Sequence, residues 1–217
     1  MLFRQRASSS LAAGVVLTCA FAASGCNNGN GATAPGSTSL YVVGAQGNFR
    51  SINTAMNAAP EGETIDVQAG TYGERVIVTK RGMKLRGTSA VLDGALLDGR
   101  GIGIHVNGAP DVEVTGFTVR NFERGIVIEN AANTTLRANE VHSNNSKDGS
   151  TAPPLAAGVS LFEGVVLIGA TNAQITDNVL RNNGHDGLMI MGASRNNTVR
   201  GNRVRDNGAQ TTPGQFG

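Results

Sequence analysis

A short glycine-aliphatic motif recurs in the second half of the chain and constrains the fold more than any other feature. It consists of a glycine followed by three mostly aliphatic residues, and it occurs at residues 103–106, 125–128, 164–167 and 187–190. The glycines are 22, 39 and 23 residues apart, which indicates a period of about 23 residues with one insertion of about 16. A period of this length is typical of a repeat protein.

Asparagine recurs with the same period in two further series. The first is Asn139, Asn178 and Asn202, with Gly116 assigned to the same place one unit earlier; the second is Asn121, Asn144, Asn183 and Asn207. Each unit therefore contains three short, β-branched strands separated by Asn/Gly corners. Such a unit is one coil of a right-handed parallel β-helix, an all-β solenoid. A coil is too small to bury its own apolar face, so coils must stack.

Stacking predicts columns of equivalent side chains about 4.8 Å apart. The two inward columns are Ile104, Ile126, Val165 and Leu188, and Val106, Ile128, Leu167 and Ile190. The outward column between them is His105, Val127, Val166 and Met189. At the corners, an asparagine amide can hydrogen-bond to the asparagine above and below, and it tolerates the left-handed backbone of a sharp turn.

The globular part is predicted to span residues 39–217. It opens with a strand at residues 40–43, followed by a short capping helix that starts after Ser51 and stops at Pro60, and this helix is expected to cover the open end of the solenoid. After Asn207 no amphipathic cap is visible. We therefore expect the chain to be a truncated form of a longer β-helix, with an inserted loop at 146–163, and a full-length protein to be a monomer.

The N-terminus has the pattern of an export signal. Arg4 and Arg6 precede an apolar stretch over residues 11–23, which is too short to cross a bilayer. The stretch ends in Ala-Ser-Gly-Cys at residues 23–26, which resembles a bacterial lipoprotein signal. The resemblance implies cleavage of residues 1–25, acylation of Cys26 and anchoring to the lipid membrane of the cell envelope, with the outer membrane favoured. Residues 26–38 read as a flexible tether.

Composition and charge exclude one class of fold and one class of partner. Thirty glycines and no tryptophan argue against a helical bundle. Removal of Arg4 and Arg6 with the signal leaves 16 basic and 16 acidic side chains, so the mature chain has no net charge. Neutral charge, few aromatic residues and an extracytoplasmic address exclude nucleic acid as a partner.

Residues 39–210 resemble the right-handed β-helix superfamily, which includes pectate lyases and a β-helix protein of nitrous-oxide-reductase maturation, a copper enzyme. Gly47-Asn48-Phe49-Arg50-Ser51-Ile52 and Gly70-Thr71-Tyr72-Gly73-Glu74 are similar to the opening of pectin-processing β-helices. The resemblance is specific for the fold. It implies little about chemistry, because this fold carries lyases, hydrolases, esterases, epimerases and inert binders.

A first candidate site involves acidic side chains. Arg124, Glu163 and Asp186 each precede a repeat glycine, which would place Glu163 and Asp186 about 5 Å apart, with Asp148 of the insertion nearby. Two such carboxylates could bind Ca²⁺ or could act as a catalytic pair on a glycosidic bond. Alternatively, Arg124 neutralises the column and the acids are solvated corner residues.

A second candidate site is a basic column, Arg120, His142, Arg181 and Arg205, at the end of the third strand of each coil. Stacked like charges favour either acidic neighbours, such as Glu113 and Glu140, or an anionic ligand. A uronate polymer fits the second alternative, because its carboxylates recur along the chain.

His185 and Lys147 are candidate bases for removal of a proton next to a uronate carboxyl group, with calcium or arginine stabilising the enolate. Alternatively, they are ordinary polar corner residues. The outward Val166 and Met189 form either an apolar floor for a sugar ring or a surface that the inserted loop covers.

Together these features predict a cell-surface protein that binds or processes an acidic, uronate-type polysaccharide, lyase-like if it is an enzyme. The alternative is a non-catalytic β-helix scaffold that binds a glycan or a protein partner.

Overall fold

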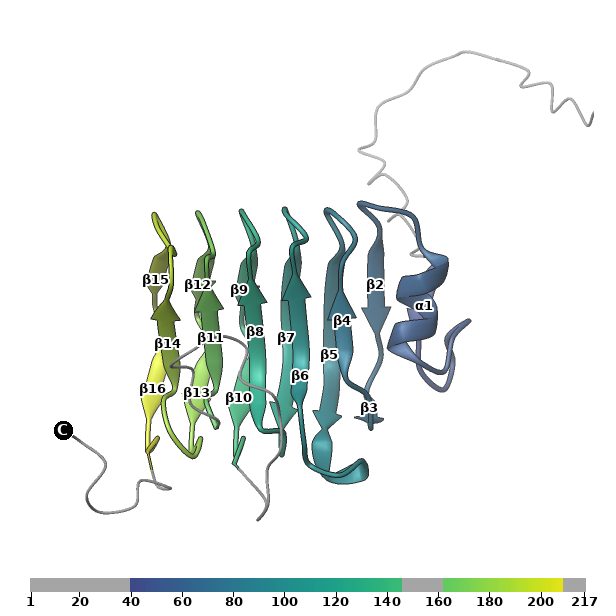
Figure 1. Ribbon diagram of the computed structural model, residues 1–217. Coiled ribbons are helices and arrows are strands. Elements are labelled where there is room, and N and C mark those ends of the chain that lie inside the picture. The colour runs from purple at the N-terminus through teal and green to yellow at the C-terminus, as the bar shows by residue number, and fades with distance from the viewer. Residues whose placement is uncertain (1–39, 146–161, 209–217) are drawn as a thin grey trace, which may run out of the picture. The chain divides into compact units, whose positions relative to one another are not determined.

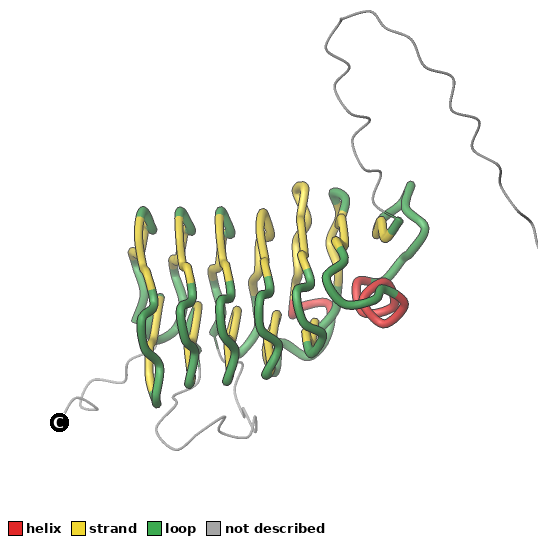
Figure 2. The backbone as a smooth tube through the Cα atoms, turned by 90° about the horizontal axis from the view of Figure 1, so that it is seen from above, coloured by secondary structure: helices red, strands yellow, loops and turns green. Residues whose placement is uncertain are grey.

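In the computed structural model, the described residues are 40–145 and 162–208, and they form a parallel β-solenoid. Figure 1 shows the coils following one another along a single axis, and Figure 2 shows the same stack from above. The predicted all-β β-helix is confirmed. Residues 1–39, which contain the predicted signal, Cys26 and most of the tether, lie outside the described residues, as do residues 146–161 of the insertion.

One sheet contains the first strand of each coil. We call it sheet B. Its parallel strands lie in the order β14 (Leu188–Met191), β11 (Val165–Ile168), β8 (Arg124–Glu129), β6 (Ile102–Asn107) and β4 (Val76–Val78).

The second sheet, called sheet A, contains the second and third strands. One path is β1 (Tyr41–Val43), β2 (Thr64–Val67), β5 (Lys84–Asp93), β7 (Glu113–Arg120), β10 (Glu140–His142), β13 (Val179–Arg181) and β16 (Arg203–Arg205). Beside it, β3 (Gly70–Tyr72) pairs with β5, and a second row continues from β7 through β9 (Thr135–Arg137), β12 (Gln174–Thr176) and β15 (Thr198–Arg200). A 3₁₀ turn at Gly94–Leu96 follows β5.

The predicted columns are confirmed by the strand register. Ile126 pairs with Ile104 on one side and Val165 on the other, and Val165 pairs with Leu188. Most members of the two inward columns are fully buried in one continuous core. Strand alternation alone therefore separates the core side of sheet B from its outer side.

Two asparagine ladders hold the corners, as predicted, but two of the assigned members were wrong by one residue. The backbone N–H of Phe117, not Gly116, donates to Asn139 Oδ1, and that of Phe122, not Asn121, donates to Asn144 Oδ1. Gly116 and Asn121 instead have positive φ, 74° and 60°. They occupy the turn position just before the ladder, where a left-handed backbone is required.

The capping helix is confirmed as α1 (Ile52–Ala58), with the Ser51 hydroxyl accepting from the Thr54 N–H. Its apolar face, Ile52, Ala55 and Met56, belongs to the solenoid core. Figure 1 shows α1 at one end of the stack, beside β2. Within the described residues, no helix has the length and apolarity needed to cross a membrane.

The last described coil is less buried than the others. Ile190, Val199 and Val204 continue inward columns, yet they are 46%, 44% and 51% exposed. The expectation that the chain is a piece of a longer β-helix stays a prediction.

Candidate functional site

The basic column lies on the outer face of sheet A, on successive strands. His142 pairs in register with Arg120 of β7 and Arg181 of β13, and Arg181 pairs with Arg205 of β16. The predicted stacking of these four side chains is therefore confirmed.

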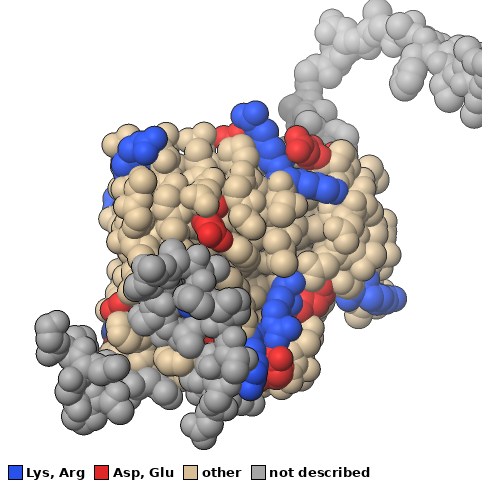
Figure 3. Space-filling view, in the orientation of Figure 1, with Lys and Arg blue, Asp and Glu red and all other residues tan. Residues whose placement is uncertain are grey.

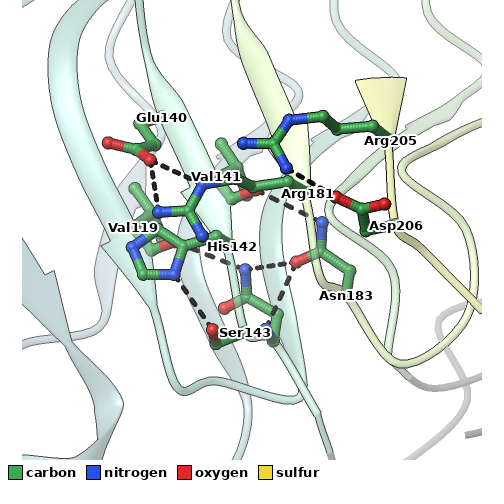
Figure 4. Close-up of polar contacts among 10 residues, drawn as sticks. Val119, Glu140, Val141, His142, Ser143, Arg181, Asn183, Arg205 and Asp206 are labelled. Carbon is green, nitrogen blue, oxygen red and sulfur yellow. Dashed lines mark hydrogen bonds and ion pairs between the residues drawn. The ribbon is translucent and has the colours of Figure 1, made fainter. Parts of the chain in front are cut away.

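Each arginine of the column forms an ion pair with a carboxylate. Arg120 lies 2.9 Å from Asp93, Arg181 lies 2.7 Å from Glu140, and Arg205 lies 2.5 Å from Asp206. Figure 4 shows the pairs of Arg181 and Arg205 beside the asparagine ladder. The expected acidic neighbour Glu140 is thus confirmed, whereas Glu113 lies in register with Lys84 and Thr135. The column is internally balanced in charge.

His142 is the neutral member of this column. Burial lowers the pKa of His142, and the Arg181 and Arg120 guanidinium groups lower it further, against the opposing effects of Glu140 and Asp93. Its Nδ1 atom lies 3.0 Å from Ser143 Oγ. Since the lowered pKa favours the neutral ring, the column presents arginine charges flanking an uncharged imidazole at neutral pH.

The acidic column is divided between two environments. The backbones of its members are adjacent, because the Gly164 N–H donates to the Asp186 carbonyl at 2.8 Å. Glu163 is fully buried and lies 3.7 Å from the Arg124 guanidinium. Asp186 is half-exposed and lies 3.0 Å from His185 Nδ1. Arg124 thus neutralises Glu163, but this acid is not the solvated corner residue that the same hypothesis expected.

A buried acid that lies next to the Arg124–Glu163 pair was not predicted from the sequence. Glu123 is 1% exposed and accepts the Gly101 N–H at 2.7 Å. Burial lowers the pKa of the Arg124 guanidinium, while the charges of Glu163 and Glu123 raise it. The sequence feature that could have indicated this buried acid is the dipeptide Glu123-Arg124 directly before the repeat glycine Gly125.

Calcium binding stays a prediction. Across residues 40–145 and 162–208, no group of three or more His, Cys, Asp or Glu side chains could hold a metal ion. Asp148 and Lys147, the other predicted metal ligand and base, lie outside the described residues.

The part of the outer face of sheet B around Val127 and Val166 is apolar but closed to solvent. Val127 and Val166 point away from the core and are fully buried, forming a second cluster with Ile168 against which Met189 and Met191 pack. The outward positions of Val166 and Met189 are confirmed, but Val166 offers no open floor for a sugar ring. The loop that was expected to cover this face falls on residues 146–161, outside the described residues.

The solenoid has a family counterpart. A family model described as a right-handed β-helix region matches residues 74–213, well over half of the chain. The chain belongs to the right-handed β-helix family. Its sequence matches no curated protein and no solved structure. Family membership accounts for the stacked coils of this β-helix, but it does not choose among the chemistries that the fold supports.

Near the last described coil, this β-helix has a hollow of 310 Å³, lined by His185, Asp186, Leu188, Val204 and Asn207 among others. The predicted base His185 and its neighbour Asp186 therefore line this hollow together with Leu188 and Val204 of the inward columns, at the end of the described solenoid. Figure 3 shows acidic and basic side chains interspersed among uncharged ones on the face that it presents. That distribution agrees with the nearly equal numbers of basic and acidic residues in the sequence, 18 and 16.

Proposed function

We propose that this β-helix protein binds an acidic, uronate-type polysaccharide at the cell envelope, to which acylated Cys26 anchors it. The observation that carries the proposal is the column of Arg120, His142, Arg181 and Arg205, one side chain per strand on the outer face of sheet A. A polymer with recurring carboxylates can follow a column with recurring guanidinium groups.

The ion pairs of the column are compatible with ligand binding. Arg181 and Arg205 are partly exposed, with side-chain exposures of 26% and 49%. The Arg205–Asp206 pair is exposed at both side chains, and such pairs contribute about 0–1 kcal/mol, so a ligand carboxylate can replace Asp206 there at small cost. Arginine keeps its charge at every physiological pH and can bind a carboxylate through two parallel hydrogen bonds.

We favour binding over cleavage because of the state of Glu163. A general acid or nucleophile must reach the substrate, and Glu163 is fully buried beside Arg124. Glu163 is therefore a structural residue, paired with Arg124 in the interior.

A second candidate function is lyase-like cleavage, with calcium as a possible aid. The observation that favours it is the His185–Asp186 pair beside the hollow, in which a carboxylate orients an imidazole that could act as a base. Lys147 and Asp148 would be its other candidate residues.

Titration calorimetry with polygalacturonate and with alginate, each with and without calcium, tests both functions. We expect the calorimetry to show binding that weakens with salt. We expect an absorbance assay on the same mixtures to detect no unsaturated product. Absence of binding to every uronate polymer would overturn the proposal, and appearance of the unsaturated product would favour the lyase.

The column is tested by R120Q/R181Q against R75Q/R81Q. Arg75 and Arg81 also pair with carboxylates, Asp98 and Asp111, away from the column. We expect the first variant to bind about tenfold more weakly and the control to bind nearly as wild type, with thermal melts confirming that both fold. If the R120Q/R181Q and R75Q/R81Q variants bound the polymer with equal affinity, the column would be excluded as the binding surface.

A further inference from the structure

A second row of outward side chains runs along the neighbouring wall of sheet A. It crosses β2, the first halves of β5 and β7, and then β9, β12 and β15, one residue per strand. Its members are Asp66, Arg86, Thr115, Arg137, Thr176 and Arg200. The preceding residue on five of these strands is buried in the core, namely Ile65, Leu85, Val114, Leu136 and Ile175. The row itself therefore faces outward.

The three arginines of this row differ from those of the Arg120 column. Arg86, Arg137 and Arg200 are all exposed. Within residues 40–145 and 162–208, none of the three takes part in an ion pair. A carboxylate ligand would not have to displace a protein carboxylate here.

Two acidic residues of this wall, Asp66 and Glu113, lie near one end, and a third, the exposed Asp177, follows Thr176 at the turn after β12. Asp66 pairs in register with Arg86, and Glu113 pairs in register with Lys84, so the two acids face two basic residues on β5. Further along, the outward residues of β9, β12 and β15 are Thr135, Arg137, Gln174, Thr176, Thr198 and Arg200. On these three strands the outward side chains are therefore either basic or carry hydroxyl or amide groups.

The row alternates arginine with threonine. Thr115 lies between Arg86 and Arg137, and Thr176 lies between Arg137 and Arg200. Successive arginines are therefore two strand spacings apart, about 10 Å, and the three span about 19 Å. The core stacking keeps this spacing rigid, because each strand is hydrogen-bonded to the next.

We infer that Arg86, Arg137 and Arg200 form a binding row for a linear, β-linked polysaccharide that presents one carboxylate on the same side per disaccharide, laid along the solenoid axis. This row is a second binding surface beside the Arg120 column. The inference rests on the proposed function only in taking the ligand to be an acidic polysaccharide. In an extended β-linked chain each sugar ring is turned over relative to the next, so same-side groups recur once per disaccharide. Each arginine can then bind one carboxylate, and the intervening threonine hydroxyls can bind sugar hydroxyl groups.

Hyaluronan oligosaccharides are the test ligand, because they carry one carboxylate per disaccharide and no sulfate. Fluorescence anisotropy with labelled tetra-, hexa- and octasaccharides measures the length dependence. We expect affinity to rise from two carboxylates to three and to change little beyond, because three arginines are available. A steady rise through the octasaccharide would contradict a three-site row.

The variant R86Q/R137Q/R200Q tests the residues against a matched control, R81Q/R195Q/R203Q, which removes the same charge elsewhere. We expect at least about a tenfold loss of hexasaccharide affinity in the first variant and less than about a threefold loss in the control. Equal losses would mean that only net charge matters, and the inferred row would be wrong.

The outcomes also separate this inference from the proposed function. If polygalacturonate or alginate binds while hyaluronan does not, the inferred row is wrong and the proposed function stands. If no acidic polysaccharide binds, both fail. Tighter binding of poly(dT) than of hyaluronan would overturn the inference in favour of a phosphate polymer.

Discussion

At the residue scale, asparagine has a structural task that other polar residues cannot fulfil in this solenoid. Asn183 is fully buried. Its Oδ1 accepts from the backbone and side-chain N–H groups of Asn144, and its Nδ2 donates to the Val141 carbonyl and to Asn207 Oδ1. One amide thus connects three coils, because it supplies a donor and an acceptor in the same plane.

We predict that Asn183→Ala lowers the free energy of unfolding by about 2–4 kcal/mol, because buried backbone groups lose their partners. Urea denaturation measures the change. Asn107→Ala, at an exposed strand end, is the control and should shift stability by less than about 0.5 kcal/mol. Similar small changes in both variants would show that the ladder contributes little.

At the element scale, α1 is fixed at both ends by the adjoining coil. The Glu74 carboxylate accepts from the Ser51 hydroxyl and from the Ile52 and Asn53 N–H groups at the N-terminus of the helix. At the other end, Lys80 Nζ donates to the carbonyls of Met56, Asn57 and Ala59. Both charges complement the helix dipole, so a helix too short to be stable alone is held in place.

We predict that Glu74→Ala lowers the free energy of unfolding by about 1–2 kcal/mol, because the helix N-terminus loses a charged acceptor. Glu61→Ala removes the same charge from an exposed position and serves as the control. Hydrogen exchange should show faster exchange in α1 for Glu74→Ala. Unchanged exchange there would contradict the anchoring role.

At the scale of the whole solenoid, burial of the inward columns is continuous until the last described coil. Ile128 and Leu167 are fully buried, whereas Ile190, next in the same column, is 46% exposed. In a repeat protein each coil is stabilised by its neighbours. Replacing an isoleucine by alanine should therefore cost more unfolding free energy where a coil lies on both sides of it.

We predict that Ile128→Ala destabilises the 217-residue chain by about 2–4 kcal/mol, against about 1 kcal/mol or less for Ile190→Ala. The two variants are each other's control, because residue type and column are the same. Equal losses of unfolding free energy would imply that the last coil is packed as tightly as the middle ones.

The sequence by itself determined the coil, the columns and the cap. Strand alternation and the repeat period are local properties, so Ile126, Val127 and Ile128 could be assigned to inward and outward faces in advance. Ser51 could likewise be placed at the start of the helix, since capping depends on residues nearby in the chain.

Only the tertiary structure decided which charges meet and which are buried. Glu163 and Asp186 follow the same pattern, yet one is buried beside Arg124 and the other is half-exposed beside His185. The one-residue shifts at Gly116 and Asn121 also became visible only from the hydrogen bonds between coils. The physical reason is that side-chain pairing and desolvation depend on residues 20 to 40 positions apart, such as Arg124 with Glu163 and Arg120 with Asp93, which a short periodic pattern does not specify.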